Sequence, residues 1–295
     1  MFVIKYKKFF IGLSMFFVVV ALLALVRFGL SLGIDFKGGS QLQFAYTDTR
    51  PDIATIKSVV AEAGFPDAVI QPTGENGFIV KSRSISDPEK DALLKTLNVD
   101  ATKASLTTIG PSVGAELKHK AIISVILVLV AIICFVAYAF RKVSKPVSSW
   151  KYGLAVIIAL IHDIAIPLGA FAVLGHFYGA ELDTLFVVAL LTTLALSIAD
   201  TIVVFDRIRE HIGTEKNTNF PELVGHSLSE TFVRSINTSL MVLVMVITLA
   251  IVGPASTKLF ATVLAIGMFF GTYSSIFLAS PLLVVFEQMQ RKRSK

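Results

Sequence analysis

The chain has 295 residues, of which 54% are hydrophobic and 16% are charged, and its mean hydropathy is +0.75. These values exclude an ordinary soluble domain and predict a membrane protein, in which each helix needs about 20 apolar residues to cross the bilayer. The formal net charge of +6 does not indicate nucleic-acid binding, because residues 31–119 hold nine basic and eleven acidic residues and the positive excess lies in the apolar part and its short loops.

The first predicted element is an apolar run at 9–26, preceded by a lysine cluster at 5–8. A basic flank before an apolar run is also typical of a cleaved signal peptide. However, residues 21–26 contain no clear small-x-small cleavage site, and the run is longer than a signal core. We therefore expect residues 1–30 to form a cytoplasmic tip followed by an uncleaved first membrane helix.

Residues 31–119 lack this apolar character and are expected to form one exported α+β domain. Strands are predicted at 41–46, 67–71, 78–81 and 104–109, and helices at 51–63 and 86–97. This βαββαβ order is the ferredoxin-like pattern. Ser86 and Glu89 have the spacing of a capping box at the start of the second helix. Because the domain has no cysteine, no acidic cluster and no histidine before His119, we expect it to bind or brace a partner.

Five further membrane helices are expected in a bundle over 120–290, which gives a polytopic α-helical protein with six transmembrane helices. They are predicted at 121–140, 152–174, 182–205, 232–252 and 259–286, followed by a basic tail at 291–295. When successive helices alternate in direction, the basic clusters at 5–8, 141–151, 207–216 and 291–295 all lie on one side of the membrane. The positive-inside rule then places both termini in the cytoplasm.

Asp200 is the most informative polar residue, because it lies inside the predicted fourth helix. An ionisable side chain at membrane depth costs about 2.5–3.5 kcal/mol on insertion scales, so it usually faces a partner or a water-filled path. Thr193, Ser197 and Thr201 share one helical face with it. Asp200 either forms a structural ion pair between helices or titrates in a proton path, and the adjacent hydroxyls favour a hydrated path.

Arg234 lies near the start of the predicted fifth helix. It shares a helical face with the hydroxyls of Thr231, Ser235 and Thr238. The arginine either extends to the cytoplasmic surface or acts as the counter-charge to Asp200.

His162 and Asp163 lie near the middle of the predicted third helix. Neighbours on a helix point about 100° apart, so the two side chains cannot face one site equally, and packing with hydrogen bonding is slightly favoured over a proton relay. On the last helix, Gly267, Gly271 and Ser275 form a small-xxx-small ridge that is suited to close helix contact.

Other chemistries have no visible site in the sequence. It contains no P-loop, no GxSxG and no HExxH motif, which argues against ATP hydrolysis and the common hydrolase mechanisms. The single cysteine, Cys134, excludes an intramolecular disulfide and a cysteine-based metal site. We therefore expect neither a metal nor a cofactor, and a transport role rather than an enzyme.

Five sequence blocks, in this order, resemble the SecF family of the bacterial protein-export machinery. They are GIDFKGG at 33–39, IGPSVGAE at 109–116, IALIHD at 158–163, DTIVVFDRIRE at 200–210 and FVRSINTS at 232–239. The resemblance covers essentially the whole chain. It implies half of a resistance-nodulation-division (RND) arrangement, in which a six-helix subunit pairs pseudo-symmetrically with SecD in the bacterial plasma membrane.

The resemblance also implies a function. With SecD, such a subunit uses the proton motive force to assist preproteins across the membrane through SecYEG after SecA has acted, and YajC is a further expected partner. Asp200 would carry the proton, and Arg234 would work with it. The family usually has Gly-Tyr-Ser-(Ile/Leu)-Asn before that aspartate, whereas this chain has ALSIA at 195–199, and Phe205 replaces a usual serine. The missing tyrosine and asparagine predict an altered tuning of proton coupling rather than an inert subunit.

Two other interpretations stay open. An RND-type half-exporter of a small molecule or lipid would need a substrate cleft in two large exported domains, whereas this chain has one domain of modest size. A non-conducting translocon scaffold would use Asp200 only structurally, and export would then survive Asp200→Asn. On either transport interpretation a separate SecD-like partner is expected, because one chain supplies half of the pseudo-symmetric arrangement.

Overall fold

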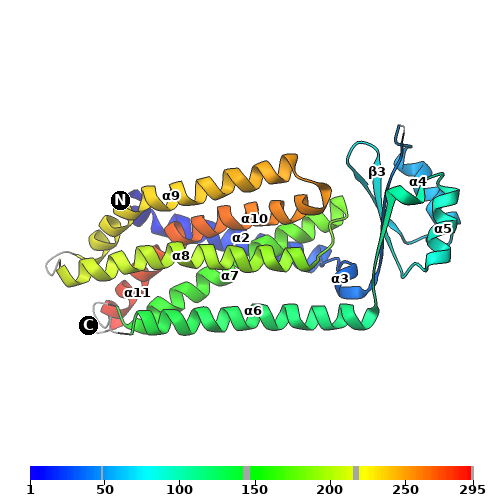
Figure 1. The fold of residues 1–295 in the computed structure, drawn as a ribbon. Coiled ribbons are helices and arrows are strands. Elements are labelled where there is room, and N and C mark those ends of the chain that lie inside the picture. Colours follow the sequence, from blue (N-terminus) through cyan, green and yellow to red (C-terminus); the bar gives the residue numbers. More distant parts are fainter. Residues whose placement is uncertain (48, 142–146, 215–218, 294–295) are drawn as a thin grey trace.

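A computed structural model describes residues 1–47, 49–141, 147–214 and 219–293, which form a long helical bundle with a small sheet domain at one end (Figure 1). Six helices in these ranges are long and apolar enough to cross a membrane, which is the expected number. They are α2 (Lys7–Phe28), α6 (Pro111–Ala139), α7 (Ser149–Tyr178), α8 (Thr184–Thr214), α9 (Phe220–Val252) and a composite last helix made of α10 (Ala255–Ser274), the π-helical segment η2 (Ser275–Ala279) and α11 (Ser280–Arg293). The chain is therefore a multi-pass helical membrane protein.

The sheet domain contains four antiparallel strands in the spatial order β2-β3-β1-β4. In chain order its elements are β1 (Gly39–Ala45), α4 (Ile53–Glu62), β2 (Val69–Thr73), β3 (Gly77–Ser82), α5 (Asp87–Thr96), the 3-10 turn η1 (Ala101–Lys103) and β4 (Ala104–Ile109). The order βαββαβ agrees with the expectation, and β3 lies between β1 and β2 as in a split βαβ unit. β2 ends two residues later than predicted and includes Pro72, which an edge strand tolerates because part of its backbone needs no ladder partner.

The core of the sheet domain lies between the sheet and its two helices. Leu42 and Phe44 are two residues apart on β1, so they point to the same face, where they are buried with Val80 of β3. The helices complete this cluster with Ile56 and Val60 of α4 and Leu93 and Leu94 of α5. Strand and helix periodicities therefore converge on one apolar core.

Two glycines fix how the first membrane helix reaches the sheet. The short helix α3 (Ile34–Lys37) ends at Gly38, and Gly38 (φ +78°) and Gly39 (φ +139°) have backbone conformations that L side chains rarely adopt. A Cβ on Gly38 would lie 2.8 Å from the Pro111 Cα at the start of α6, and one on Gly39 would lie 2.5 Å from the Ser82 carbonyl oxygen of β3. The first two sequence blocks therefore meet in space, and their glycines allow it.

The sheet domain and its entry segment are fixed to the connection between α7 and α8. Lys81 Nζ of β3 lies 3.0 Å from Glu181 Oε2. The Asp35 Oδ2 atom accepts hydrogen bonds from the backbone N–H and the hydroxyl of Thr184, at 2.9 and 2.6 Å. Because Thr184 begins α8, the Asp35 carboxylate satisfies a free donor of the first helical turn.

Two helices begin well before the apolar spans predicted from the sequence. α6 begins at Pro111, because proline is favoured in the first turn of a helix, where its missing N–H is not needed. The helix then continues without a break across the expected domain boundary at 119. α9 begins at Phe220 rather than 232, because the buried side chains of Leu223, Val224 and Leu228 give the polar stretch an apolar face. Hydropathy predicts the lipid-crossing length of a helix but not where the helix begins.

α7 lies inside the bundle, whereas α2, α6 and α9 have apolar outer faces. α2 packs on α7 backbone to backbone, since a Cβ on Gly169 would lie 2.5 Å from the Ala21 Cα. The buried residues of α7 include both His162 and Asp163. The exposed apolar side chains include Phe9, Leu23 and Val26 on α2, Ile126 and Leu127 on α6, and Met241, Met245 and Ile251 on α9.

Both termini lie at the end of the bundle opposite the sheet domain (Figure 1). The lysine cluster at 5–8 and the described parts of the other three basic clusters lie at the same end, as the alternating topology predicts. Lys142, Lys145, Lys216 and Lys295 lie outside the described residues. Which side of the membrane this end faces stays a prediction.

Candidate functional site

Two groups of polar side chains among the described residues include residues predicted inside the membrane helices, and the first group is fully buried. His162 and Asp163 of α7 are each 1% exposed. One Asp163 oxygen lies 3.0 Å from His162 Nδ1, and the other accepts a hydrogen bond from Ser197 Oγ at 2.5 Å. Although neighbouring positions on a helix point about 100° apart, the contact between His162 Nδ1 and the Asp163 carboxylate places both residues in one cluster.

Hydroxyl groups continue this cluster from α8 to the composite last helix. Thr201 Oγ1 lies 2.8 Å from Ser275 Oγ, which donates to the Ser197 carbonyl oxygen at 3.0 Å. Ser275 is the first residue of the π-helical segment, and such wide turns are frequent at functional sites. The close approach of α8 and α10 needs a glycine, since a Cβ on Gly271 would lie 3.0 Å from the Ser197 Cβ.

Two buried polar atoms near this cluster have no hydrogen-bond partner among the residues that the structure describes. They are Thr193 Oγ1 and His162 Nε2. Thr193 packs on Gly267, where a Cβ would lie 2.6 Å from Thr193 Cγ2. Buried polar atoms in proteins are nearly always satisfied, often by ordered water, so these atoms are where water would complete the network.

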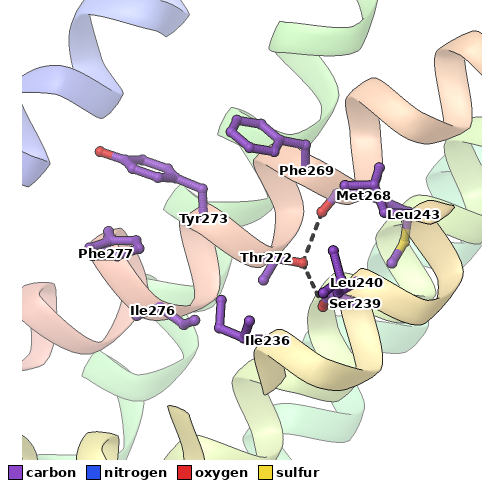
Figure 2. A pocket seen from close by; sticks show the side chains of 10 residues that line it. All are labelled: Ile236, Ser239, Leu240, Leu243, Met268, Phe269, Thr272, Tyr273, Ile276 and Phe277. Atoms are coloured by element: carbon purple, nitrogen blue, oxygen red, sulfur yellow. Dashed lines mark hydrogen bonds between the residues drawn. The ribbon is translucent and has the colours of Figure 1, made fainter. Parts of the chain in front are cut away.

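The second group is centred on the half-buried Asp200, whose contacts span three helices. Asp200 Oδ2 of α8 accepts a hydrogen bond from Ser239 Oγ of α9 at 3.2 Å. Ser239 Oγ lies 2.7 Å from Thr272 Oγ1 of α10, which also lies 2.9 Å from the Met268 carbonyl oxygen. Figure 2 shows the Ser239 and Thr272 hydroxyls pointing toward each other between the two helices. A carboxylate and two hydroxyls therefore link α8, α9 and α10.

Ser239 and Thr272 also line a mostly apolar cavity of about 230 Å³ between α9 and α10 (Figure 2). The other lining residues are Ile236, Leu240, Leu243, Met268, Phe269, Tyr273, Ile276 and Phe277. Leu240 and Phe269 are more than half exposed, so the cavity opens toward the outer face of the bundle. A cavity of this size has room for water, and its two hydroxyls supply polar partners beside Asp200.

Arg234 does not pair directly with Asp200 in this conformation. Its side chain is exposed, and among the ion pairs of the described residues none joins the two. The buried hydroxyl face of α9 consists of Thr231, Ser235 and Ser239. Arg234 is exposed and, with Thr231, lines a pocket between α9 and α8. Arg234 precedes Ser239 by five residues, which is about 7.5 Å along a helix axis. The arginine therefore lies nearer to the terminal end of the bundle than the carboxylate.

The departures from the usual family pattern change packing more than charge. Phe205 is fully buried, and its ring packs edge to face on Phe140 and Tyr152, with centroids 5.8 and 5.4 Å apart. Ala199 is exposed and Leu196 packs on an apolar cluster, so neither side chain offers Asp200 a polar contact. The polar contact of the carboxylate comes instead from the facing helix.

Ser239, Thr272 and their link to Asp200 were not predicted from the sequence. The signal for Ser239 was present, because Thr231, Ser235 and Ser239 repeat at i+4 on one face. Thr272 gave no such signal, since a threonine in an apolar helix commonly bonds only to its own backbone.

Known proteins resemble this chain over most of its length. A family model described as "Protein export membrane protein SecD/SecF, C-terminal" matches residues 89–289, and one described as "SecD/SecF GG Motif" matches residues 23–49, which include Gly38 and Gly39. The protein translocase subunit SecF of Thermobaculum terrenum is 38% identical, with 97% of this chain and 93% of that protein covered. The SecF subunit of Anaerolinea thermophila is 35% identical, with coverages of 94% and 91%.

A solved structure has the same fold. The crystal structure of SecDF from Thermus thermophilus, a translocon-associated membrane protein, matches with a TM-score of 0.84 and 31% sequence identity. The match covers 97% of this chain but 38% of that longer chain.

Proposed function

Because the chain belongs to the SecF family of protein translocase subunits, we propose that it acts with a SecD partner to assist the translocation of preproteins. In this proposal, translocation crosses the bacterial plasma membrane and is driven by the proton motive force. Preproteins would pass through SecYEG after SecA has acted, with YajC as a further partner. In this proposal the sheet domain faces the exported side and both termini face the cytoplasm, which fits the basic residues at their end of the bundle.

Two observations support a SecD partner. The matched SecDF chain is much longer than the part that resembles this chain, as expected if the SecD and SecF portions are fused there. The outer faces of α2, α6 and α9 expose large apolar side chains, which helices of a partner could cover within the membrane.

The observation that best supports proton coupling is that the half-buried Asp200 carboxylate accepts a hydrogen bond from the Ser239 hydroxyl. When ionised, the carboxylate accepts a hydrogen bond from Ser239; when protonated, it can donate one. Ser239 would then turn its own hydrogen toward Thr272, so the contacts among α8, α9 and α10 change with the proton. We propose that this change is the switch by which proton entry moves the helices.

Arg234 would serve the ionised state of the switch. Its flexible side chain starts about 7.5 Å along α9 from Ser239, so it can extend toward the carboxylate when the proton leaves. In the conformation described here Ser239 holds the carboxylate and Arg234 is exposed. The cycle would alternate between these two partners of Asp200.

The test is export of a secreted reporter in cells depleted of the native subunit and complemented with single variants at matched protein level. We expect Asp200→Asn and Arg234→Met to reduce export to the level of uncomplemented cells. Asp206→Asn is the matched control, because Asp206 is an exposed acid on the same helix that pairs with Arg209 at 2.5 Å. This control should export normally.

The other interpretations give different outcomes in the same cells. Full export by Asp200→Asn would reject proton coupling and favour the scaffold. Normal preprotein export with a loss of small-molecule efflux in Asp200→Asn would favour a half-exporter instead.

A further inference from the structure

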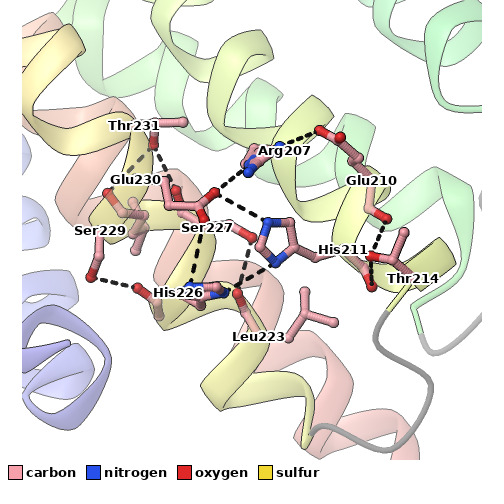
Figure 3. Close-up of polar contacts among 12 residues, drawn as sticks. Arg207, Glu210, His211, Thr214, Leu223, His226, Ser227, Ser229, Glu230 and Thr231 are labelled. Atoms are coloured by element: carbon pink, nitrogen blue, oxygen red, sulfur yellow. Dashed lines mark hydrogen bonds and ion pairs between the residues drawn. The ribbon is translucent and has the colours of Figure 1, made fainter.

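Three possible metal ligands converge where α8 and α9 meet, at the terminal end of the bundle (Figure 3). His211 comes from the last turn of α8, and His226 and Glu230, four residues apart, share one face of α9. One ligand atom from each residue lies within 4.8 Å of the other two. We propose that these residues bind a divalent transition-metal ion, and that zinc is the ion whose usual ligands they match.

The ligand types support this choice. Two imidazoles and one glutamate form the ligand set of open zinc sites, in which water takes the fourth position. The side chain of His226 is 55% exposed, so solvent can reach that position. The side chain of His211 is 7% exposed, which holds its ring in place.

The Glu230 carboxylate is already oriented for metal binding. Arg207 Nε donates to one of its oxygens, Oε2, while His226 Nε2 lies 3.5 Å from the other, Oε1. Arg207 also contacts Glu210 Oε2 at 2.6 Å, so its guanidinium is held between two acids. Carboxylates that bind metals are usually hydrogen-bonded by such outer partners, which fix their direction.

The two imidazoles are also brought together closely. Their Nδ1 atoms lie 3.2 Å apart, and His211 Nε2 lies 3.2 Å from Glu230 Oε2. Each imidazole therefore brings a ring nitrogen, the atom by which histidine binds a metal, close to the Glu230 carboxylate. The side chains are therefore gathered before any ion arrives, which lowers the cost of ordering them on binding.

A bound ion would join α8 to α9. These helices also carry Asp200 and Ser239, so the ion would restrict the relative movement of the two helices that hold this contact. The metal site itself rests on its own side chains and does not depend on the proposed transport role.

The test is zinc binding by the whole chain, purified in detergent with a histidine-free affinity tag and stripped with a chelator. In calorimetric titrations we expect one zinc ion per wild-type chain and an affinity at least about tenfold weaker for His226→Gln. His119→Gln is the matched control, because His119 is exposed on α6 near the sheet domain, and it should bind zinc like the wild type.

Thermal unfolding gives a second measurement. Zinc should raise the melting temperature of the wild type and of His119→Gln, but not that of His226→Gln, because a ligand that binds the folded state stabilises it. Circular dichroism checks that His226→Gln folds normally, as expected for an exposed side chain. Unsaturable zinc binding by the wild type, or equal zinc affinity in wild type and His226→Gln, would overturn the proposal.

Discussion

Gly39 lies where the segment from the first membrane helix enters the sheet, and its backbone passes close to β3. The replacement Gly39→Ala should bring a methyl group to 2.5 Å from the Ser82 carbonyl oxygen and place alanine at φ +139°. Strained backbone of this kind costs about 1–3 kcal/mol, and the close contact adds to that. We expect faster hydrogen–deuterium exchange of the β1 and β3 amides in the detergent-solubilised chain.

A second glycine separates the two causes. Gly64 also has a positive φ, +96°, but a Cβ there would meet nothing within 4 Å. Gly64→Ala should therefore carry only the conformational cost and have the smaller effect. Equal loss of protection in both variants would show that the contact with Ser82 is unimportant.

Individual site residues differ in how well the sequence predicts them. Asp200 was recognisable because an acid inside an apolar run is costly and has few structural explanations. The partner on α9 was not, because spacings of three and four both fit a helical face, and only packing decides that Ser239 rather than Arg234 contacts the carboxylate. The buried cluster of His162, Asp163 and Ser197 depends on side-chain rotamers, which the spacing of residues in the sequence does not determine.

Among the elements, α5 provides a prediction about pH. Glu89 in its first turn accepts hydrogen bonds from Arg83 and from Ser86, and these lower the pKa of its carboxyl from 4.5 to about 2. A lowered folded-state pKa means that the carboxylate stabilises the folded domain above the unfolded pKa, and that this contribution is lost as the pH falls from about 4.5 to about 2.

The pH dependence can be measured with two variants. Glu89→Gln keeps a capping group without the charge. Between pH 5 and pH 2, the urea midpoint of the sheet domain should therefore fall less in this variant than in the wild type, because the variant lacks the one carboxylate whose protonation destabilises the folded state. Asp91→Asn, at an exposed acid on the same helix, should behave like the wild type. If the urea midpoint of Glu89→Gln depended on pH as that of the wild type does, the Glu89 carboxylate would not be the cause of the loss of stability at low pH.

Elements were predictable where local patterns suffice. β4 spans Ala104–Ile109 as predicted, and α5 has the predicted capping box, because alternation and caps are local signals. The early starts of α6 and α9 were not predicted, since polar residues continue these helices beyond the apolar spans. The π-helical segment had no sequence signal at all, and it lies where Ser275 meets α8.

At the scale of the whole molecule, α8 connects all the regions to which we assign a role. It begins at Thr184 with the Asp35 contact, carries Asp200 along its length, and has His211 in its last turn. A helix transmits displacement along its axis because its backbone hydrogen bonds keep it stiff. A displacement of α8 at Asp200 would therefore move both ends of the helix, one at the contact with Asp35 and the other at the junction with α9.

The contact between the sheet domain and the bundle gives the last prediction. Lys81 and Glu181 form an ion pair whose side chains are only 17% and 16% exposed. Because hydrogen bonds to charged groups in such settings contribute about 1.5–3 kcal/mol, Lys81→Glu should loosen the domain from the α7–α8 connection. Hydrogen–deuterium exchange should then rise at residues 179–183 while the strand amides of the domain core stay protected. The double variant Lys81→Glu with Glu181→Lys restores opposite charges and should restore protection. Continued fast exchange there would mean that the ion pair does not hold the domain, and that other contacts do so, such as the hydrogen bond from Gln71 Nε2 to the Gly179 carbonyl oxygen at 3.0 Å.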